Sequence, residues 1–281
     1  MIAYRSMAPG DIPAGLSLCR AYGWNQLARD WELFLHLSPA GCCVGVDEEG
    51  EVVGTVTTLR YEDHFSWIGM VLVDPAKQRQ GIGGQLLQEA LHILRNEKIV
   101  KLDATPEGRV VYLKLNFVDE YRLSRMHCSD VLSTSLPASR ARPMHHTDLP
   151  RLIDLDSEIF GANRTAVLEW MWKGAPQHAF VTEGSNEITG YCFGRPGHRF
   201  THIGPVIAPD HDCAIHLVSA ALRNCPGPVI LDVLQDKSEL VIWLSTNGFA
   251  EQRQLIRMYH GADPGPGVPA RQFTILGPEF G

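Results

Sequence analysis

Three glycines lie between a strand-like segment and a helical one, where they could bind a diphosphate. Gly81, Gly83 and Gly84 follow Arg79 and precede residues whose apolar members recur at helical spacing. Glycine has no Cβ, so its backbone can approach a ligand closely, and the first turn of a helix leaves N–H groups without partners. Together with the charge of Arg79, these amides are suited to bind the pyrophosphate of a nucleotide.

The segments on either side of this turn have the patterns of a strand and an amphipathic helix. Residues 71–73 form a short apolar run before Pro75, and apolar residues after the turn recur at Leu87, Leu91 and Leu94. The turn does not contain the dinucleotide pattern G-x-G-x-x-G, and the triphosphate pattern G-x-x-x-x-G-K-S/T does not fit either. The sequence therefore predicts a diphosphate site of another kind.

The remaining pattern, Gln78-x-x-Gly81-x-Gly83, resembles the coenzyme A signature Q/R-x-x-G-x-G/A of the GNAT acyltransferase superfamily. The resemblance implies acetyl-CoA as the co-substrate, with backbone N–H groups at 71–73 pairing with its pantetheine arm and stabilising the oxyanion of the reaction. The positions that it assigns to acetyl-CoA are Val71, Leu72, Val73, Gln78, Arg79, Gln80, Gly81, Ile82, Gly83, Gly84, Thr105 and Tyr112.

A second match to the family lies downstream, where residues 105–117 are in register with the pattern N-x-x-A-x-x-x-Y-x-x-x-G-F. Tyr112 stands at the position of the family's usual acid, so the resemblance implies that it protonates the departing thiolate. Thr105, Gly108 and Asn116 depart from the pattern. Asparagine is the commonest non-glycine residue at a left-handed helix terminus, so we expect Asn116 to keep the turn.

Composition limits the class of protein. A chain of 281 residues suggests about two domains, and a formal charge of -7 without a dense Lys/Arg stripe argues against nucleic acid as a partner. The sequence has neither a signal-peptide pattern nor an apolar run of the roughly 18 residues that a membrane helix needs, so we expect a cytoplasmic protein with no membrane partner. Seven cysteines without C-x-x-C spacing argue against a metal site.

The chain repeats itself at an interval near 135 residues. Arg5-x-Met7-x-x-x-Asp11 recurs as Arg142-x-Met144-x-x-x-Asp148, and three further places agree in order and spacing: residues 51–54 with 187–190, 102–103 with 231–232, and 117–126 with 249–258. We predict two tandem GNAT domains, residues 1–133 and 141–281, joined near residues 134–141. The resemblance implies an α/β (α+β) fold for each, with a mixed, mostly antiparallel sheet flanked by helices. Asp11 and Asp148 precede prolines and are expected to cap helices.

The second copy lacks the glycine turn. In its place stand Asp210, His211, Asp212 and Cys213, and two carboxylates there would repel a pyrophosphate. We expect the first domain to bind acetyl-CoA, and the second to be a degenerate partner that packs against it or shapes the acceptor pocket.

The acceptor site and the general base are less well specified. Trp24 and Asn25 belong to an aromatic and amide-rich segment that could hold an amine, and His202 belongs to a polar, glycine-rich segment of the second copy. Asp103 is a candidate for contact with the substrate, but its repetition at Asp232, where no glycine turn exists, favours a structural role.

These observations favour an enzyme that moves an acetyl group from acetyl-CoA to a primary amine of a small molecule. Two alternatives stay open: a non-catalytic acyl-CoA sensor, and an acetyltransferase acting on a protein or peptide. Because two copies in one chain can replace the dimer of single-domain relatives, a monomer is plausible beside a homodimer.

Overall fold

The computed structural model describes residues 1–62, 64–131, 136–185, 187–225 and 227–281. Residues 132–135, at which the predicted junction begins, lie outside the described residues. The first half of the chain (1–131) and the second half (136–281) carry the same elements in the same order, which confirms the predicted repeat. In the first half these are β1 (Ala3–Ser6), α1 (Ile12–Ala21), α2 (Ala28–Leu37), β2 (Cys43–Val46), β3 (Val52–Tyr61), β4 (Phe65–Val73), α3 (Ile82–Ile93), β5 (Val100–Ala104), α4 (Pro106–Leu113) and β6 (Val118–Cys128).

The second half repeats this series and adds one short strand at its end. Its elements are β7 (Arg142–Pro143), α5 (Leu149–Phe160), α6 (Thr165–Gly174), β8 (Phe180–Gly184), β9 (Glu187–Arg195), β10 (Thr201–Ile207), α7 (His211–Arg223), β11 (Val229–Leu234), α8 (Ser238–Thr246), β12 (Ala250–His260) and β13 (Gln272–Thr274). The predicted fold class, a mixed and mostly antiparallel sheet flanked by helices, is confirmed.

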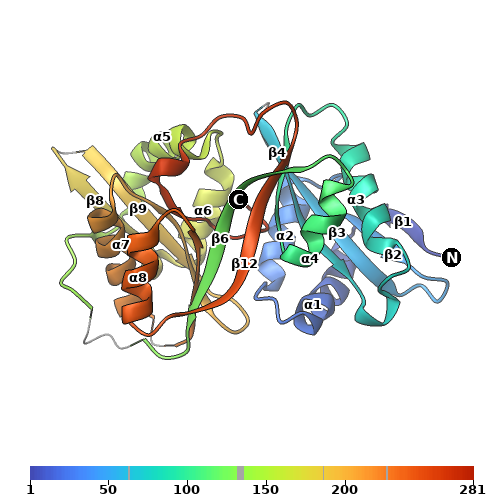
Figure 1. Cartoon of the computed structure of the whole chain (residues 1–281), viewed down its shortest axis with the longest axis horizontal. Helices are drawn as coiled ribbons and strands as arrows, with labels where there is room; N and C mark the ends of the chain where they lie inside the picture. Colours follow the sequence, from blue (N-terminus) through green and yellow to red (C-terminus); the bar gives the residue numbers. More distant parts are fainter. Residues whose placement is uncertain (63, 132–135, 186, 226) are drawn as a thin grey trace.

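The two halves exchange their last long strands. Within the described residues all strands belong to one sheet in the order β1-β2-β3-β4-β5-β12-β6-β11-β13-β10-β9-β8-β7. β12 of the second half therefore pairs with β5 of the first, and β6 of the first half pairs with β11 of the second. Figure 1 shows β6 and β12 side by side at the centre, between two lobes formed by the rest of each half.

Two buried ion pairs fix the register of this exchange. Arg257 on β12 lies opposite Asp103 on β5 and holds both of its oxygens, with N–O distances of 2.9 and 2.8 Å. Arg125 on β6 lies opposite Asp232 on β11 and does the same at 2.7 Å for both bonds. Each aspartate of the repeat is thus bound by the arginine of the other half. A slip of one residue would leave charges buried without partners, so the pairs specify this pairing.

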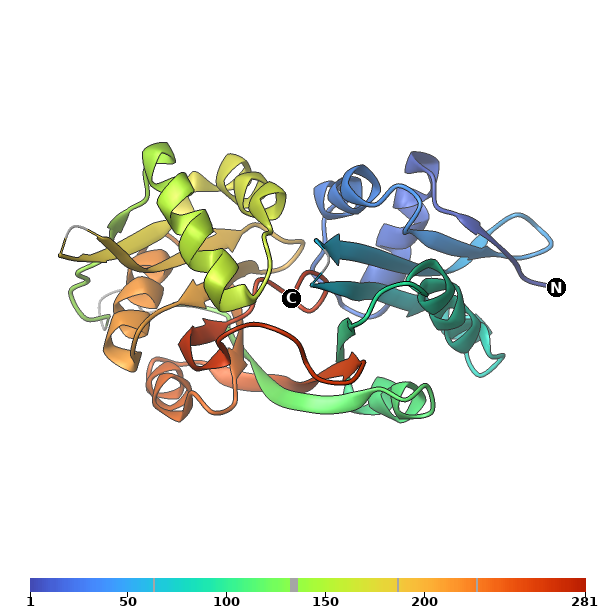
Figure 2. The same ribbon diagram turned by 90° about the horizontal axis from the view of Figure 1, so that it is seen from above.

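The lobes also share an apolar core. One cluster contains buried side chains of both halves, among them Phe34, Trp67, Phe160 and Phe280. The segment 275–281 returns from the second half to the first, where the Phe280 ring stacks on Phe34 with ring centres 4.7 Å apart. The Tyr61 hydroxyl donates to the Phe280 carbonyl at 2.6 Å. Figure 2 shows this end of the chain between the lobes.

The prediction that the side chains of Asp11 and Asp148 cap the helices that follow is wrong. Neither side chain bonds an N–H of the helix that follows. Asp11 instead binds Arg5 at 2.7 and 2.9 Å, and Asp148 binds Arg142 at 2.7 and 3.0 Å. Each carboxylate also accepts from a backbone N–H three residues before it, within the preceding 3-10 turn. The repeated sequence motif therefore encodes a repeated arginine clamp.

None of the described helices has both the length and the apolar character that a membrane span requires.

Candidate active site

The N-terminus of α3 has no side-chain cap. Its N-cap is Gly81, in the left-handed region with φ 82°, and the Gly81 carbonyl accepts the first helical bond, from the Gln85 N–H at 3.0 Å. The amides of residues 82–84 precede that bond, so they belong to the turn whose N–H groups a helix cannot satisfy itself. A Cβ added at Gly81 or Gly84 would meet no atom within 4 Å, which leaves room for a ligand against the backbone.

The strand before this turn separates from its neighbour. In the part of the chain that the structure describes, β4 and β5 pair in parallel only at Ser66 with Val100 and at Trp67 with Lys101. Beyond Trp67, the edge of β4 that faces β5 has no strand partner among the described residues. Met70, with φ 53°, lies where the pairing of β4 with β3 changes register, so a bulge bends the strand at the opening. Main-chain groups are thus available along the gap between β4 and β5.

One pocket of about 920 Å³ connects the glycine turn to this gap and continues to the exchanged strands. Most of the predicted site residues line it: Val71, Leu72, Val73, Gln78, Arg79, Gly81, Ile82, Gly83, Gly84, Thr105, Tyr112, Trp24 and Asp103. Gln80 is exposed and does not line the pocket, nor do Asn25 and His202. The structure therefore brings together the residues that the sequence predicted along the turn, the strand and the helix α4.

Tyr112 lies on α4 at the side of this pocket. Burial raises the pKa of its phenol to about 12, so the group stays protonated at neutral pH. Thr105 caps α4, because its hydroxyl accepts the Gly108 N–H at 3.1 Å. Asn116 has φ 62°, which confirms the left-handed turn expected there. The short helix therefore ends as predicted, and its cap and its closing turn hold Tyr112 in place.

Three of the predicted substrate residues have structural partners. Asn25 is buried and binds the segment after β9, accepting the N–H groups of Arg199 and Phe200 at 2.9 and 3.0 Å. His202 is buried and does not line the pocket; its Nε2 is 3.2 Å from Asp232, and burial lowers its pKa. Both oxygens of Asp103 are occupied by Arg257, although its side chain borders the pocket. Of the four predicted acceptor residues, Trp24 is the one that lines the pocket and is not assigned to one of these structural contacts.

Several further residues line the pocket. Tyr22 and Gln26 belong to the aromatic and amide-rich segment of the sequence, and the others carried no signal for the site. Tyr22, at the end of α1, donates to the Val73 carbonyl at 2.6 Å and accepts from the Gln78 amide, so it ties the helix to the turn. At the far end of the pocket lie Gln26, Arg125, Arg253, Leu255, Pro278 and Glu279. Arg253, Leu255, Pro278 and Glu279 come from the second half, and they reach the first only through the strand exchange and the returning segment 275–281.

The corresponding region of the second half is closed by the chain itself. α7 is capped by Asp210, whose carboxylate accepts the Cys213 N–H at 2.8 Å, so the helix end already holds an anion. Within the described ranges, β10 and β11 pair in parallel only at Thr201 with Val229 and at His202 with Ile230, just as β4 and β5 pair only at their start. The gap beyond is filled by β13, which pairs antiparallel with both strands. The second half thus keeps the fold but not the site.

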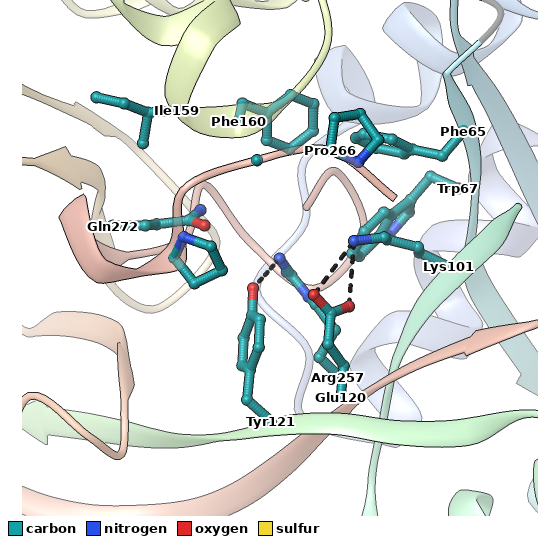
Figure 3. A pocket seen from close by; sticks show the side chains of 12 residues that line it. Phe65, Trp67, Lys101, Glu120, Tyr121, Ile159, Phe160, Arg257, Pro266 and Gln272 are labelled. Atoms are coloured by element: carbon teal, nitrogen blue, oxygen red, sulfur yellow. Dashed lines mark hydrogen bonds and ion pairs between the residues drawn. The ribbon is translucent and has the colours of Figure 1, made fainter. Parts of the chain in front are cut away.

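A much smaller cavity lies behind the exchanged strands, bordered by Lys101, Glu120, Tyr121 and Arg257 (Figure 3). Its volume is about 20 Å³, enough for about one water molecule. Lys101 and Glu120 form an ion pair there at 3.1 Å, and Arg257 donates to the Tyr121 hydroxyl. These four side chains bind one another, and a cavity of this size is too small for a substrate, so we assign it to the support of Arg257.

Comparisons with known proteins match both halves. Residues 16–117 match the model of the acetyltransferase (GNAT) family, and residues 152–274 match that of an acetyltransferase (GNAT) domain. A curated relative, holothin acyltransferase of Pseudoalteromonas sp. (strain SANK 73390), is 26% identical over 243 residues, which cover 86% of this chain and 82% of that protein.

Solved structures agree in fold. A candidate acetyltransferase from Pyrococcus horikoshii superposes with a TM-score of 0.80 and 23% identity, over 100% of this chain and 96% of that one. A tandem GNAT protein from the clavulanic acid biosynthesis pathway superposes with a TM-score of 0.64 and 14% identity, over 94% of this chain and 100% of that one.

Proposed function

The chain belongs to the GNAT acetyltransferase family, and from this premise we propose that it transfers an acetyl group from acetyl-CoA to the primary amine of a small molecule. One observation carries the proposal: a single pocket joins the glycine turn at Gly81, the gap between β4 and β5, and the side chain of Tyr112. Along this pocket the turn can bind a diphosphate, the gap can hold an amide-containing arm, and Tyr112 can donate a proton.

The turn has the chemistry that coenzyme A requires. The uncapped end of α3 offers N–H groups and the positive end of the helix dipole to a diphosphate. Lys77 and Arg79 line the same part of the pocket and add positive charge. The gap beyond Trp67 leaves the edge of β4 unpaired, so main-chain groups can bind the amides of a pantetheine arm. When bound, acetyl-CoA would supply the acetyl group as a thioester.

The residues of this chain would then handle charge and protons. Backbone N–H groups of residues 71–73 would stabilise negative charge on the thioester oxygen, because they are fixed in place before the reaction. Tyr112 would give its proton to the sulfur of the leaving group. Asp103 is not assigned as the base, since both of its oxygens already bind Arg257.

Thiol release from acetyl-CoA in the presence of a panel of small amines tests the proposal. We expect amine-dependent release by the wild-type protein and its loss in Tyr112→Phe. Tyr4→Phe is a matched control, because Tyr4 lies on β1 outside the pocket. Binding of acetyl-CoA without release for any small amine would reject the proposal in favour of a sensor, and release with peptides alone would favour a peptide acetyltransferase.

We also propose that one chain is sufficient, because residues of a single chain line the whole pocket. In this proposal residues 1–133 and 141–281 are the two units of the duplication. Activity that appears only when the chain dimerises, measured by sedimentation alongside thiol release, would contradict it.

A further inference from the structure

The far end of the pocket contains an arginine without a partner. Arg253 lines the pocket from β12, and among the described residues its guanidinium forms no ion pair or hydrogen bond. The neighbouring Arg125 differs, since it is bound by both oxygens of Asp232. Burial, with the nearby charge of Arg125, lowers the pKa of Arg253 to about 10 against the opposing charges of Asp232 and Glu279, so it is still charged at neutral pH. A half-buried guanidinium without an ion pair is stabilised when an anion binds it.

The same end of the pocket contains a carboxylate with one unbound oxygen. Glu279 is only 2% exposed. Among the residues that the structure describes, Oε1 binds Arg195 and Oε2 accepts no hydrogen bond, although the Gln26 amide lies near this carboxyl. Arg195 is shared with Asp30, which it contacts at 2.6 Å, so one guanidinium serves two carboxylates. Burial raises the pKa of Glu279, but Arg195, His202 and Gln26 outweigh it, and the net pKa lies below the usual range. Glu279 therefore stays an anion.

Gln26 adds a further acceptor at this position. Its side-chain oxygen is buried and has no hydrogen-bond partner among the described residues, and Gln26 lines the pocket together with Glu279. An ammonium group has three N–H donors and no acceptor, so it can bind two such oxygens at once. Two residues with a buried, unbound oxygen, Glu279 and Gln26, thus line the same end of one pocket as Arg253.

This end lies away from the part that suits coenzyme A. α3 packs on β2, β3 and β4, whereas Arg253 lies on β12, separated from β4 by β5. β5 ends at Ala104, which pairs with Ile256, so Arg253 lies beyond the end of β5 and across the gap from β4. Arg253 is therefore placed to meet the acceptor and not the diphosphate.

We infer that the acceptor is an amine that also carries a carboxylate, as an amino acid does, with Arg253 binding the carboxylate while Glu279 and Gln26 bind the ammonium group. This inference rests on the proposed function for the reaction itself. It adds the class of acceptor and assigns the second half a direct part in recognising it. Glu279 and Arg253 act here by binding the acceptor, before its amine is deprotonated.

Matched acceptors test the inference. Thiol release is measured for amino acids of increasing chain length and for the amines that lack only their carboxylate, with wild type, Arg253→Gln, Arg253→Lys and Glu279→Gln. Arg95→Gln is the control, because Arg95 is exposed and outside the pocket. We expect the wild type to prefer at least one amino acid over its decarboxylated partner by tenfold or more in kcat/KM. Arg253→Gln should abolish this preference, and Arg253→Lys should keep part of it.

Binding measurements separate this inference from the proposed function. Calorimetric titration of the CoA-loaded protein with the same compounds should show that amino acids bind more tightly than the decarboxylated amines, whether or not turnover occurs. Glu279→Gln should weaken both members of each pair. Equal binding of both members by the wild type would overturn the inference, even if thiol release supports the proposed reaction. Weakened coenzyme A binding in Arg253→Gln would overturn it too, because the guanidinium would then belong to the cofactor arm.

Discussion

Replacing Gly81 by alanine should show how much the left-handed conformation of the turn contributes to coenzyme A binding. Gly81 has φ 82°, where a residue with a Cβ costs about 1–2 kcal/mol. The added methyl group meets no protein atom within 4 Å, so the cost is conformational and not a clash. If the turn keeps its shape, the free energy of unfolding falls by this amount, and the melting temperature falls by roughly 2–4 °C for a chain of this size. If the turn relaxes, the cost appears on binding, as a loss of roughly 5–30-fold in coenzyme A affinity.

Gly50→Ala is the matched control. Gly50 has φ 88° in the turn between β2 and β3, outside the pocket, and its added methyl group also meets nothing within 4 Å. The same conformational cost should lower the melting temperature to a similar extent, with coenzyme A affinity within about threefold of the wild type. Scanning calorimetry of the free protein and titration calorimetry with coenzyme A measure both quantities. The reasoning fails if Gly81→Ala changes neither, or if Gly50→Ala loses as much affinity.

Three further predictions concern single side chains. Tyr112→Phe should lower kcat for thiol release by about 10²-fold and leave coenzyme A affinity within about threefold. In the wild type, ionisation of this phenol should cause no loss of rate between about pH 7 and 10, since its pKa is about 12. Asp103→Asn should lower the free energy of unfolding by about 3–5 kcal/mol in a urea titration, because it leaves the buried Arg257 without its anion; a stable variant that lacks activity would instead make Asp103 a catalytic group. The Arg142 guanidinium lowers the pKa of Asp148 from 3.8 to about 2, so this carboxyl stabilises the fold above about pH 4 and the contribution is lost as the pH falls towards 2. Asp148→Asn should therefore cost roughly 2 kcal/mol at pH 7 and flatten acid unfolding in that window, and an unchanged pH profile would contradict the assignment.

The parts of the site that were predictable are those encoded by local sequence. Gly81 needs only its own freedom at positive φ to begin α3, and Asn116 needs only its tolerance of the left-handed region to end the segment after α4. The register of Tyr112 follows from that short helix. The loss of the site in the second half was also visible locally, because Asp210 replaces a glycine turn by a carboxylate.

The roles of Asp103, Asn25 and His202 could not be predicted from local sequence, because each depends on a partner far along the chain. Asp103 is bound by Arg257, and Asn25 binds a segment roughly 175 residues away. The repetition of Asp103 at Asp232 did indicate a structural role. It did not show that each aspartate binds the arginine of the opposite half.

By itself, the sequence determined the duplicated fold, the glycine turn with its helix, and the absence of that turn from the second half. Only the tertiary structure decided that β6 and β12 change places, that β13 closes the second gap, and that Arg253 and Glu279 border the first half's pocket. The reason is physical. Turns and helix ends are set by the conformational preferences of a few adjacent residues, whereas two similar strands can pair with either copy, and long-range packing and buried charges select between them.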